Sequence, residues 1–264
     1  RLLWTLTPDL ALGLSEGARY QADAPGVLYL TGILPYTLVE RLQMQDEPSD
    51  STENYLRNNV LWSVDVSWRV RAGLLLYAEF LADDIATQSS AMPTRGGVQF
   101  GLAYAPRWRG WDWTLGAEYT RVSDYTYSVY YQDLCRCDWE HQGQPLGYAL
   151  GPDAELMLLR AGLAPTRRLS FSTWVQHLRR GDGAIGRPWR PAEADCACDD
   201  ADAWSFDDPA QAWTVGCEAR YRPGALIWAG AAVEHVARHH AGDAGESEDW
   251  TSETRLRLML SAGM

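Results

Sequence analysis

The sequence has no lysine, only 4 Phe and 5 His, and no long apolar run. All 23 basic residues are therefore Arg, and we attach no function to that bias. Because a membrane-spanning helix needs roughly 20 consecutive apolar residues, the lack of such a run excludes one. The formal net charge of -12 argues against a nucleic-acid-binding protein, which would carry a basic surface. No signal peptide begins the chain at Arg1, so we expect the sequence to be processed or incomplete.

Trp and Tyr are abundant, with 13 of each. These side chains suit an interface at which one end is wet, as in the aromatic girdles of membrane barrels. Residues 60–80 then alternate strictly, with Trp62, Val64, Val66 and Trp68 on one face and polar residues on the other. The lipid-facing surface of a transmembrane β-barrel has this pattern. A soluble β-sandwich or lipocalin-like barrel is the alternative, but its exposed face would have to be charged.

The same alternation recurs along the chain and predicts eleven strands. They are expected at about 2–7, 10–19, 58–70, 74–85, 97–104, 111–122, 154–165, 168–180, 212–222, 225–237 and 250–261. Short turns and long polar connections alternate between them, as in bacterial outer-membrane barrels. We therefore predict an all-β, antiparallel transmembrane outer-membrane β-barrel, with residues 1–264 forming one barrel domain.

The two kinds of connection also predict an orientation. Short turns of such barrels are periplasmic and long loops extracellular, so the chain should end in the periplasm and its first strand should start outside. A barrel with an even strand number and periplasmic ends cannot begin there. We therefore expect the chain to supply about eleven C-terminal strands of a larger barrel, with further strands before residue 1 and a gap between the first and last strands.

Three segments carry a resemblance to a known family: "NNVLWSVDVSWRVRAGLLLYAEFLADDI", "GAEYTRVSDYTYS", and above all "HQGQPLGYALGPDAELMLLRAG" followed by "RLSFSTWVQHLRRGDG". Residues 58–183 resemble the capsule assembly protein Wzi family of outer-membrane proteins. The resemblance implies a large barrel, preceded by a helical plug in the best-known members, that acts as a surface lectin and holds capsular polysaccharide to the cell. Two departures are the absence here of the plug and first strands, and the ending "LMLSAGM" in place of a terminal aromatic residue.

Two loops contain residue types that bind carbohydrate. Sugars are recognised by planar hydrogen-bonding groups and by aromatic faces that stack on their C–H surface. The candidate polysaccharide-binding residues are Tyr130, Tyr131, Asp133, Trp139, Glu140, Gln142, Trp189, Arg190 and Trp204. The alternative is that these are ordinary wet loops with aromatic anchors at the membrane edge.

Charged residues also occupy the predicted inner face of the barrel. Opposite charges there should pair into ladders, because a lone charge in a narrow interior is costly; a polysaccharide or ion path is the alternative. This set is Asp65, Arg69, Glu79, Asp83, Glu118, Arg180, Glu218, Arg220, Arg255 and Arg257. Asp153, just after a Gly-Pro pair, is expected to accept hydrogen bonds at a turn and not to bind a ligand.

Four of the 5 cysteines form two closely spaced pairs, Cys135 with Cys137 and Cys196 with Cys198. Outer-membrane surfaces are reached through an oxidising compartment, so we predict a disulfide between the two loops that ties them into a lid. Local bridges within each pair are the second alternative, and zinc is the third because the one-residue spacing fits it poorly. Cys217 alternates with Val215 and should remain a free thiol on the lipid face.

No other chemistry is indicated. The acidic run from Asp195 to Asp208 lacks the spacing of a calcium-binding loop, and the His and Ser residues form no catalytic set, so we expect neither metal nor cofactor nor enzyme activity. The expected partners are outer-membrane lipid, surface polysaccharide and other envelope proteins, but no nucleic acid. The leading hypothesis is a polysaccharide-binding or polysaccharide-anchoring barrel, and the alternative is a porin-like or structural barrel subunit of a larger envelope complex.

Overall fold

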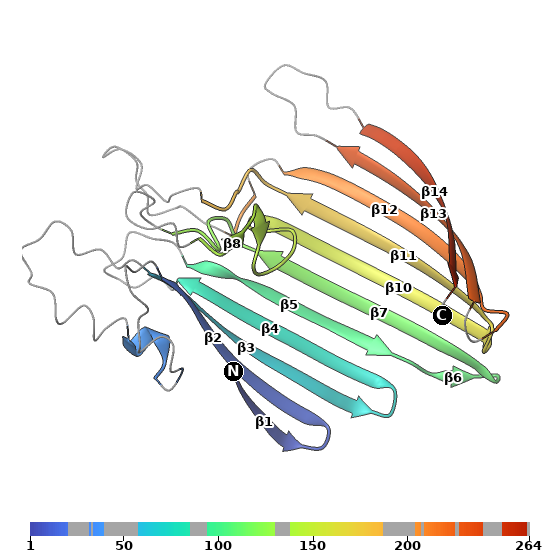
Figure 1. Ribbon diagram of the computed structural model, residues 1–264, viewed down its shortest axis with the longest axis horizontal. Coiled ribbons are helices and arrows are strands. Elements are labelled where there is room, and N and C mark those ends of the chain that lie inside the picture. The colour runs from blue at the N-terminus through green and yellow to red at the C-terminus, as the bar shows by residue number, and fades with distance from the viewer. Residues whose placement is uncertain are drawn as a thin grey trace, which may run out of the picture.

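The computed structural model describes residues 1–20, 32, 34–39, 58–84, 94–129, 138–186, 204–206, 209–224, 227–239 and 250–262. One large antiparallel sheet contains eleven long or medium strands in chain order (Figure 1). They are β1 (Leu2–Thr7), β2 (Leu10–Tyr20), β3 (Asn58–Arg71), β4 (Leu74–Asp84), β5 (Arg95–Tyr104), β7 (Trp111–Val122), β10 (Ala154–Thr166), β11 (Leu169–Arg180), β12 (Ala210–Tyr221), β13 (Ile227–His239) and β14 (Trp250–Ala262). The predicted eleven strands are confirmed.

Three further strands are only two residues long. β6 (Arg107–Trp108) pairs with the start of β7, whereas β8 (Glu140–His141) and β9 (Gln144–Pro145) form a separate small hairpin. Among the described residues, no helix is both long and apolar enough to cross a membrane.

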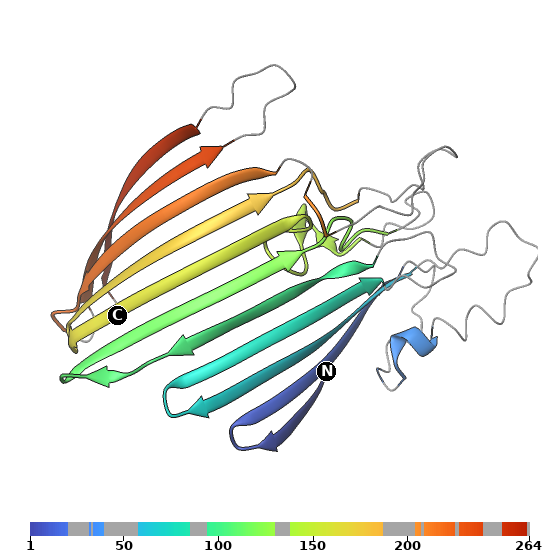
Figure 2. The same ribbon diagram turned by 180° about the vertical axis from the view of Figure 1, so that it is seen from behind.

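Every long strand pairs with its neighbour in the chain, so the sheet is a continuous meander. Both views show a twisted, curved sheet (Figures 1 and 2). Within the described strands, β1 pairs only with β2 and β14 only with β13, so the sheet is open between them. The predicted gap is therefore present.

The pairing register separates a polar face from an apolar face. Asp65 lies opposite Glu79, and Glu79 opposite Gln99, which places the three side chains on one face. The other face carries Trp68 and Phe100, which are 47% and 53% exposed. By the same register, Arg69, Glu118, Glu218 and Arg255 lie on the polar face, and the predicted lipid-facing residues all lie on the apolar one.

Because an unpaired backbone group is costly in lipid, the alternation also predicts that each outward-facing residue lies on a strand with two hydrogen-bonded neighbours, and for the last strand this is wrong. Leu256, Leu258 and Leu260 lie on β14, which has only β13 beside it among the described strands. Their exposure of 69% to 79% is accordingly higher than that of the other apolar residues quoted above.

The two ends of the sheet differ, as the loop lengths predicted. Short connections join β1 to β2, β3 to β4, β5 to β7, β10 to β11 and β12 to β13 at one end, and the strand ends that flank the long connections lie at the other (Figure 1). The turn between β3 and β4 depends on Gly73, whose φ of +79° favours glycine. We call the end with the long connections the wide end.

Candidate functional site

A folded segment covers the polar face at the wide end. This mouth segment consists of residues 123–129 and 138–153, between β7 and β10, and includes the β8–β9 hairpin. Its Tyr127 is buried against Leu61 and Val122 of the sheet, with Trp139 and Tyr148 packed around them. Leu61 and Val122 are polar-face positions, so the segment lies on the inner side of the sheet.

Tyr127 connects the parts of the mouth segment. Its backbone N–H donates to Asp83 Oδ2 at 2.7 Å, and its carbonyl accepts from the N–H of Trp139 at 2.7 Å. Its hydroxyl accepts from the backbone N–H of Tyr148 at 3.0 Å. Burial raises the pKa of Tyr127 to about 12, since a phenolate here would lose its hydration. The ring is therefore neutral at physiological pH.

Arg95 fastens the first turn of the mouth segment to β5. The side chain is 2% exposed, and its Nη1 donates to the carbonyls of Ser128 at 3.1 Å and Tyr125 at 3.3 Å. The neighbouring hydroxyls of Ser123 and Thr126 hydrogen-bond at 2.9 Å. Since Asp83 is also buried, its carboxylate and the Arg95 guanidinium provide opposite charges within this inner network.

The β8–β9 hairpin is held from the other side by β2. Arg19 donates to the carbonyls of Asp138 and Glu140. The Asp138 carboxylate accepts from the N–H of Val129 at 2.9 Å, and burial raises its pKa above the ordinary value. The ring of Trp139 lies so close to Gly17 that a Cβ there would be 2.8 Å from it. The hairpin therefore has a fixed position over the polar face.

The predicted loop residues fall into four groups, of which Trp204 is the last. Glu140 and Gln142 lie at the tip of the hairpin, with Gln142 exposed in the turn and Glu140 accepting from the N–H of Gly143 at 3.1 Å. Trp139 packs at the base of the hairpin, and its indole N–H is buried with no partner among the described residues. Five predicted residues lie outside the described residues: Tyr130, Tyr131, Asp133, Trp189 and Arg190.

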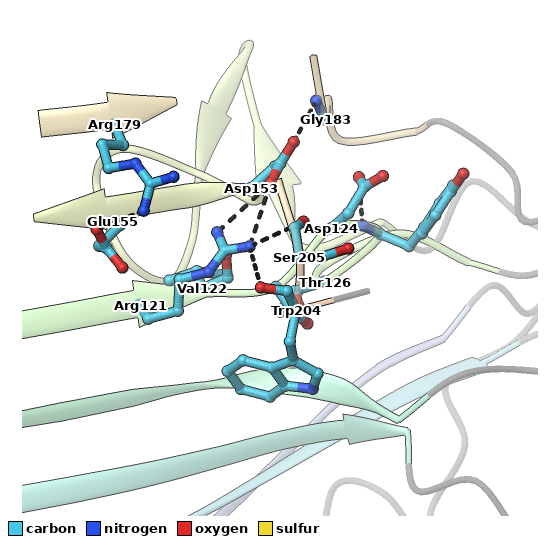
Figure 3. A network of polar contacts seen from close by, with 12 residues as sticks. Arg121, Val122, Asp124, Thr126, Asp153, Glu155, Arg179, Gly183, Trp204 and Ser205 are labelled. Carbon is cyan, nitrogen blue, oxygen red and sulfur yellow. Dashed lines mark hydrogen bonds and ion pairs between the residues drawn. The ribbon is translucent and has the colours of Figure 1, made fainter. Parts of the chain in front are cut away.

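Trp204 belongs to a second polar cluster, around Arg121 and Asp153 (Figure 3). Arg121 Nη2 donates to the Trp204 carbonyl at 3.0 Å, and the Trp204 indole N–H donates to the carbonyl of Thr94 at 3.0 Å. The Arg121 guanidinium also stacks on the ring of Phe206, with its Cζ 3.7 Å from the centroid. By register, Arg121 shares its face with Val98 and Phe100, so Trp204 and Trp139 lie on opposite faces.

Asp153 closes this second cluster. It pairs with Arg121 at 3.4 Å, both side chains being less than 10% exposed, and accepts from the N–H of Gly183 at 3.2 Å. Its φ of 51° is unusual for a residue other than glycine, although Asp tolerates it better than most. Asp153 is thus an acceptor as predicted, but its partners are Gly183 and Arg121 of other segments and not its own turn. Arg179 and Glu155 form an adjacent ion pair at 3.3 Å (Figure 3).

The predicted charge pairing on the polar face is present in part. Glu218 pairs with Arg220 at 2.5 Å, and Glu253 contacts both Arg255 at 2.7 Å and Arg238 at 3.6 Å. Asp65 pairs with Arg1 at 2.9 Å. Asp65 and Glu79, in contrast, are two carboxylates directly opposite each other. The ladders thus run mainly along β12 to β14.

The predicted thiol and metal chemistry has a limited test. Cys217 is an exposed free thiol on the apolar face, as expected. The other four cysteines and the acidic residues of the run lie outside the described residues, namely Cys135, Cys137, Cys196, Cys198, Asp195, Asp199, Asp200, Asp202, Asp207 and Asp208. In the described ranges, no three His, Cys, Asp or Glu side chains gather as a metal site.

Sequence reasoning did not single out Arg19, Arg95 or Arg121, which hold the two clusters. Each of these arginines is the first or the last-but-one residue of a strand beside a long connection, and that position was the available signal. Their hydrogen-bond partners are backbone carbonyls of other loops. A carbonyl partner leaves no mark in the side-chain sequence, so the contacts could not be predicted from it.

The fold and the two faces define an antiparallel outer-membrane β-barrel. No family model matches the chain, and no curated protein matches it. Among solved structures, it is similar to Wzi from Escherichia coli, described as an outer-membrane protein involved in group 1 capsule assembly and a carbohydrate-binding β-barrel. That likeness has a TM-score of 0.57 and 12% identity over 99% of this chain and 51% of that one, so this chain spans about half of its length.

An outer-membrane channel from Pseudomonas putida F1 is a more distant match, with a TM-score of 0.33 and 13% identity over 98% of this chain and 79% of that one. At these identities the likeness to Wzi concerns the fold.

Proposed function

We propose that the protein is a non-enzymatic outer-membrane surface barrel that binds or anchors capsular or other surface polysaccharide. The observation that carries the proposal is the mouth segment, which presents an exposed polar hairpin on a rigid support over the polar face. Glu140, His141, Gln142 and Gln144 offer carboxylate, imidazole and amide groups there, which suit sugar hydroxyls. The fold of the carbohydrate-binding barrel Wzi supports the same assignment.

The proposal includes an orientation. The wide end faces the outside of the cell and the tight turns face the periplasm, with the C-terminus on the periplasmic side. The grouping of all long connections at one end supports it, because outer-membrane barrels keep their short turns inside. In this orientation the mouth segment meets polymer at the cell surface. A bridge joining Cys135 or Cys137 to Cys196 or Cys198 remains a prediction for the same end.

Binding of the purified full chain to an array of capsular polysaccharides tests the proposal. The variants are His141→Ala and Gln142→Gly, the latter chosen because glycine tolerates the φ of 51° at this position. Gln211→Ala on the apolar face is the matched control. We expect both hairpin variants to weaken polysaccharide binding while the control binds normally. Failure of the unchanged chain to retain any polymer would refute the proposal.

A porin-like or structural barrel is the second candidate, favoured by the uncovered polar stretch of the sheet beyond the mouth segment. There, a hollow of about 260 Å³ is lined by Tyr77, Glu118 and Arg160, among others. Conductance across a planar bilayer separates the two candidates. If the protein is a binding barrel with a fixed mouth segment, the unsubstituted protein should not conduct ions. If it is a porin, the unsubstituted protein should conduct them.

A further inference from the structure

Two aromatic rings on the polar face lie against glycines of the neighbouring strand. A Cβ at Gly101 would be 2.5 Å from the Tyr77 hydroxyl, and one at Gly216 would be 2.2 Å from the six-membered ring of Trp174. In each case the strand after the glycine carries a carboxylate at the same level, Glu118 beyond Gly101 and Glu234 beyond Gly216. The wall therefore presents a ring, a glycine and a carboxylate in a row, twice.

The first ring is already engaged, because the Tyr77 hydroxyl donates to Glu118, so the second ring is the better candidate for a ligand. Trp174 is half-buried in the middle of β11, away from the mouth segment, while Gly216 beneath it is buried. Directly opposite Trp174 on its other side is Arg160 of β10, so their Cβ atoms are about 5 Å apart. The other polar-face positions around the ring are Ser172, Gln176, Thr214 and Glu218. An aromatic surface is thus surrounded by hydroxyl, amide, carboxylate and guanidinium groups.

Two carboxylates near this ring have partners, whereas the neighbouring arginine has no ion pair within the part of the chain that the structure describes. Glu218 is held by Arg220, and Glu118 accepts from the Tyr77 hydroxyl at 2.5 Å. Arg160 is exposed and forms no ion pair with any residue that the structure describes. It also borders the hollow of about 260 Å³ between β4 and β10. Arg160 is therefore a donor with capacity for an anion next to an aromatic surface.

We propose that Trp174 and Arg160 form a subsite on the barrel wall for one acidic pyranose unit of a polysaccharide. The C–H face of the sugar packs on the indole, its carboxylate accepts from the Arg160 guanidinium, and its hydroxyls meet Gln176 and Glu218. The subsite rests on the proposed function and places a saccharide contact well below the hairpin. A ring that only fills the space above a glycine would stabilise the sheet and bind nothing.

Oxidation of tryptophan in the unchanged full chain tests the subsite without any substitution. N-Bromosuccinimide modifies accessible indoles, and mass spectrometry of the peptides reports each one. We expect oligogalacturonate, an acidic oligosaccharide, to protect Trp174 but not Trp213, which lies on the apolar face and is 45% exposed. Neutral dextran should protect Trp174 much less. Equal oxidation of Trp174 with and without saturating oligogalacturonate would overturn the proposal.

Two substitutions measure the contributions of ring and charge. Trp174→Ala should weaken oligogalacturonate binding about threefold to tenfold, and Arg160→Met about tenfold or more, from the ordinary strengths of aromatic packing and charged hydrogen bonds. Trp213→Ala and Arg107→Met are the matched controls, the latter removing one positive charge at the turn end. Affinities equal to those of the controls would refute the subsite while leaving the hairpin as the binding surface. If the unchanged chain bound no saccharide at all, that result would instead refute the proposed function.

Discussion

Replacing Arg121 by Met removes the centre of the cluster on the apolar face. The guanidinium pairs with Asp153, donates to the carbonyls of Val122 at 2.8 Å and Trp204 at 3.0 Å, and stacks on Phe206. Methionine keeps much of the side-chain length but provides none of these contacts. The substitution therefore tests whether this buried group fixes residues 204–206 to the sheet.

The expected cost follows from burial. Arg121 and Asp153 have side chains that are 5% and 9% exposed, and removing one partner of such a pair leaves an uncompensated carboxylate. That situation costs about 3 to 5 kcal/mol. The exposed pair of Arg107 and Asp112, with side chains 75% and 71% exposed at 3.6 Å, is the internal comparison. Its loss should change the free energy of unfolding by about 0 to 1 kcal/mol.

Equilibrium unfolding in guanidinium chloride, with both variants in the same detergent micelles, measures the free energy of unfolding of each. Oxidation of Trp204 by N-bromosuccinimide, measured in its own peptide by mass spectrometry, reports whether the segment leaves the sheet locally, which would lower the global cost. The double variant Arg121→Met with Asp153→Asn should recover part of the loss, since no buried charge is then left alone. If Arg121→Met costs no more than Arg107→Met and Trp204 stays protected, then the cluster does not stabilise the wide end.

Three other outcomes are expected. Burial raises the pKa of Tyr127 from 10.0 to about 12, so its stabilising contribution is complete below pH 10 and is lost as the pH rises through about 12. The difference between the absorbance titrations of the unchanged chain and Tyr127→Phe should show a phenol that ionises near pH 12. Ionisation near pH 10 would contradict its burial. Val64→Arg in the middle of β3 should cost about 2 to 4 kcal/mol in lipid vesicles, against about 0 to 1 for Ser67→Arg on the polar face, and equal costs would mean that the faces are assigned wrongly. Gly101→Ala brings a Cβ within 2.8 Å of the Ala117 carbonyl, so unfolding should become easier by about 1 to 3 kcal/mol, whereas Gly224→Ala, which meets nothing within 4 Å, serves as the control.

The strands could be predicted because the signal that defines them is local. Trp62, Val64 and Val66 alternate with serine and aspartate, and a period of two fixes both the strand and the face that each side chain takes. The pairing of the strands that are joined by short turns also followed, since a short turn leaves those two strands no other partner. The edge position of β14 followed from the alternation of short and long connections, which required a gap between the first and last strands, and not from the pattern of Leu256 and Leu258.

The candidate site was less predictable, because loop residues act through contacts that are distant in sequence. Trp139 and Trp204 are loop aromatic residues of the kind that bind sugars. In the structure, however, Trp139 packs over Gly17 and Trp204 donates to the Thr94 carbonyl. Trp174 went unnoticed because it reads as one more aromatic residue in a strand. Its distinct surroundings come from Arg160 on β10 and Gly216 on β12. Only the pairing register shows that these two residues lie beside Trp174.

The meander has a consequence for how the chain can change. Among the described residues, each long strand hydrogen-bonds only to the long strands next to it in the chain, apart from the two-residue β6, so hairpins can form one after another without waiting for remote segments to meet. The long connections at the wide end join strands that are already neighbours, and their length enters folding only through the slowly growing entropy of loop closure. Surface recognition can therefore diversify by exchange of whole loops, while the sheet that carries them keeps its register. Within the mouth segment that freedom is reduced, because Arg19, Asp83 and Arg95 fix its backbone to three separate strands.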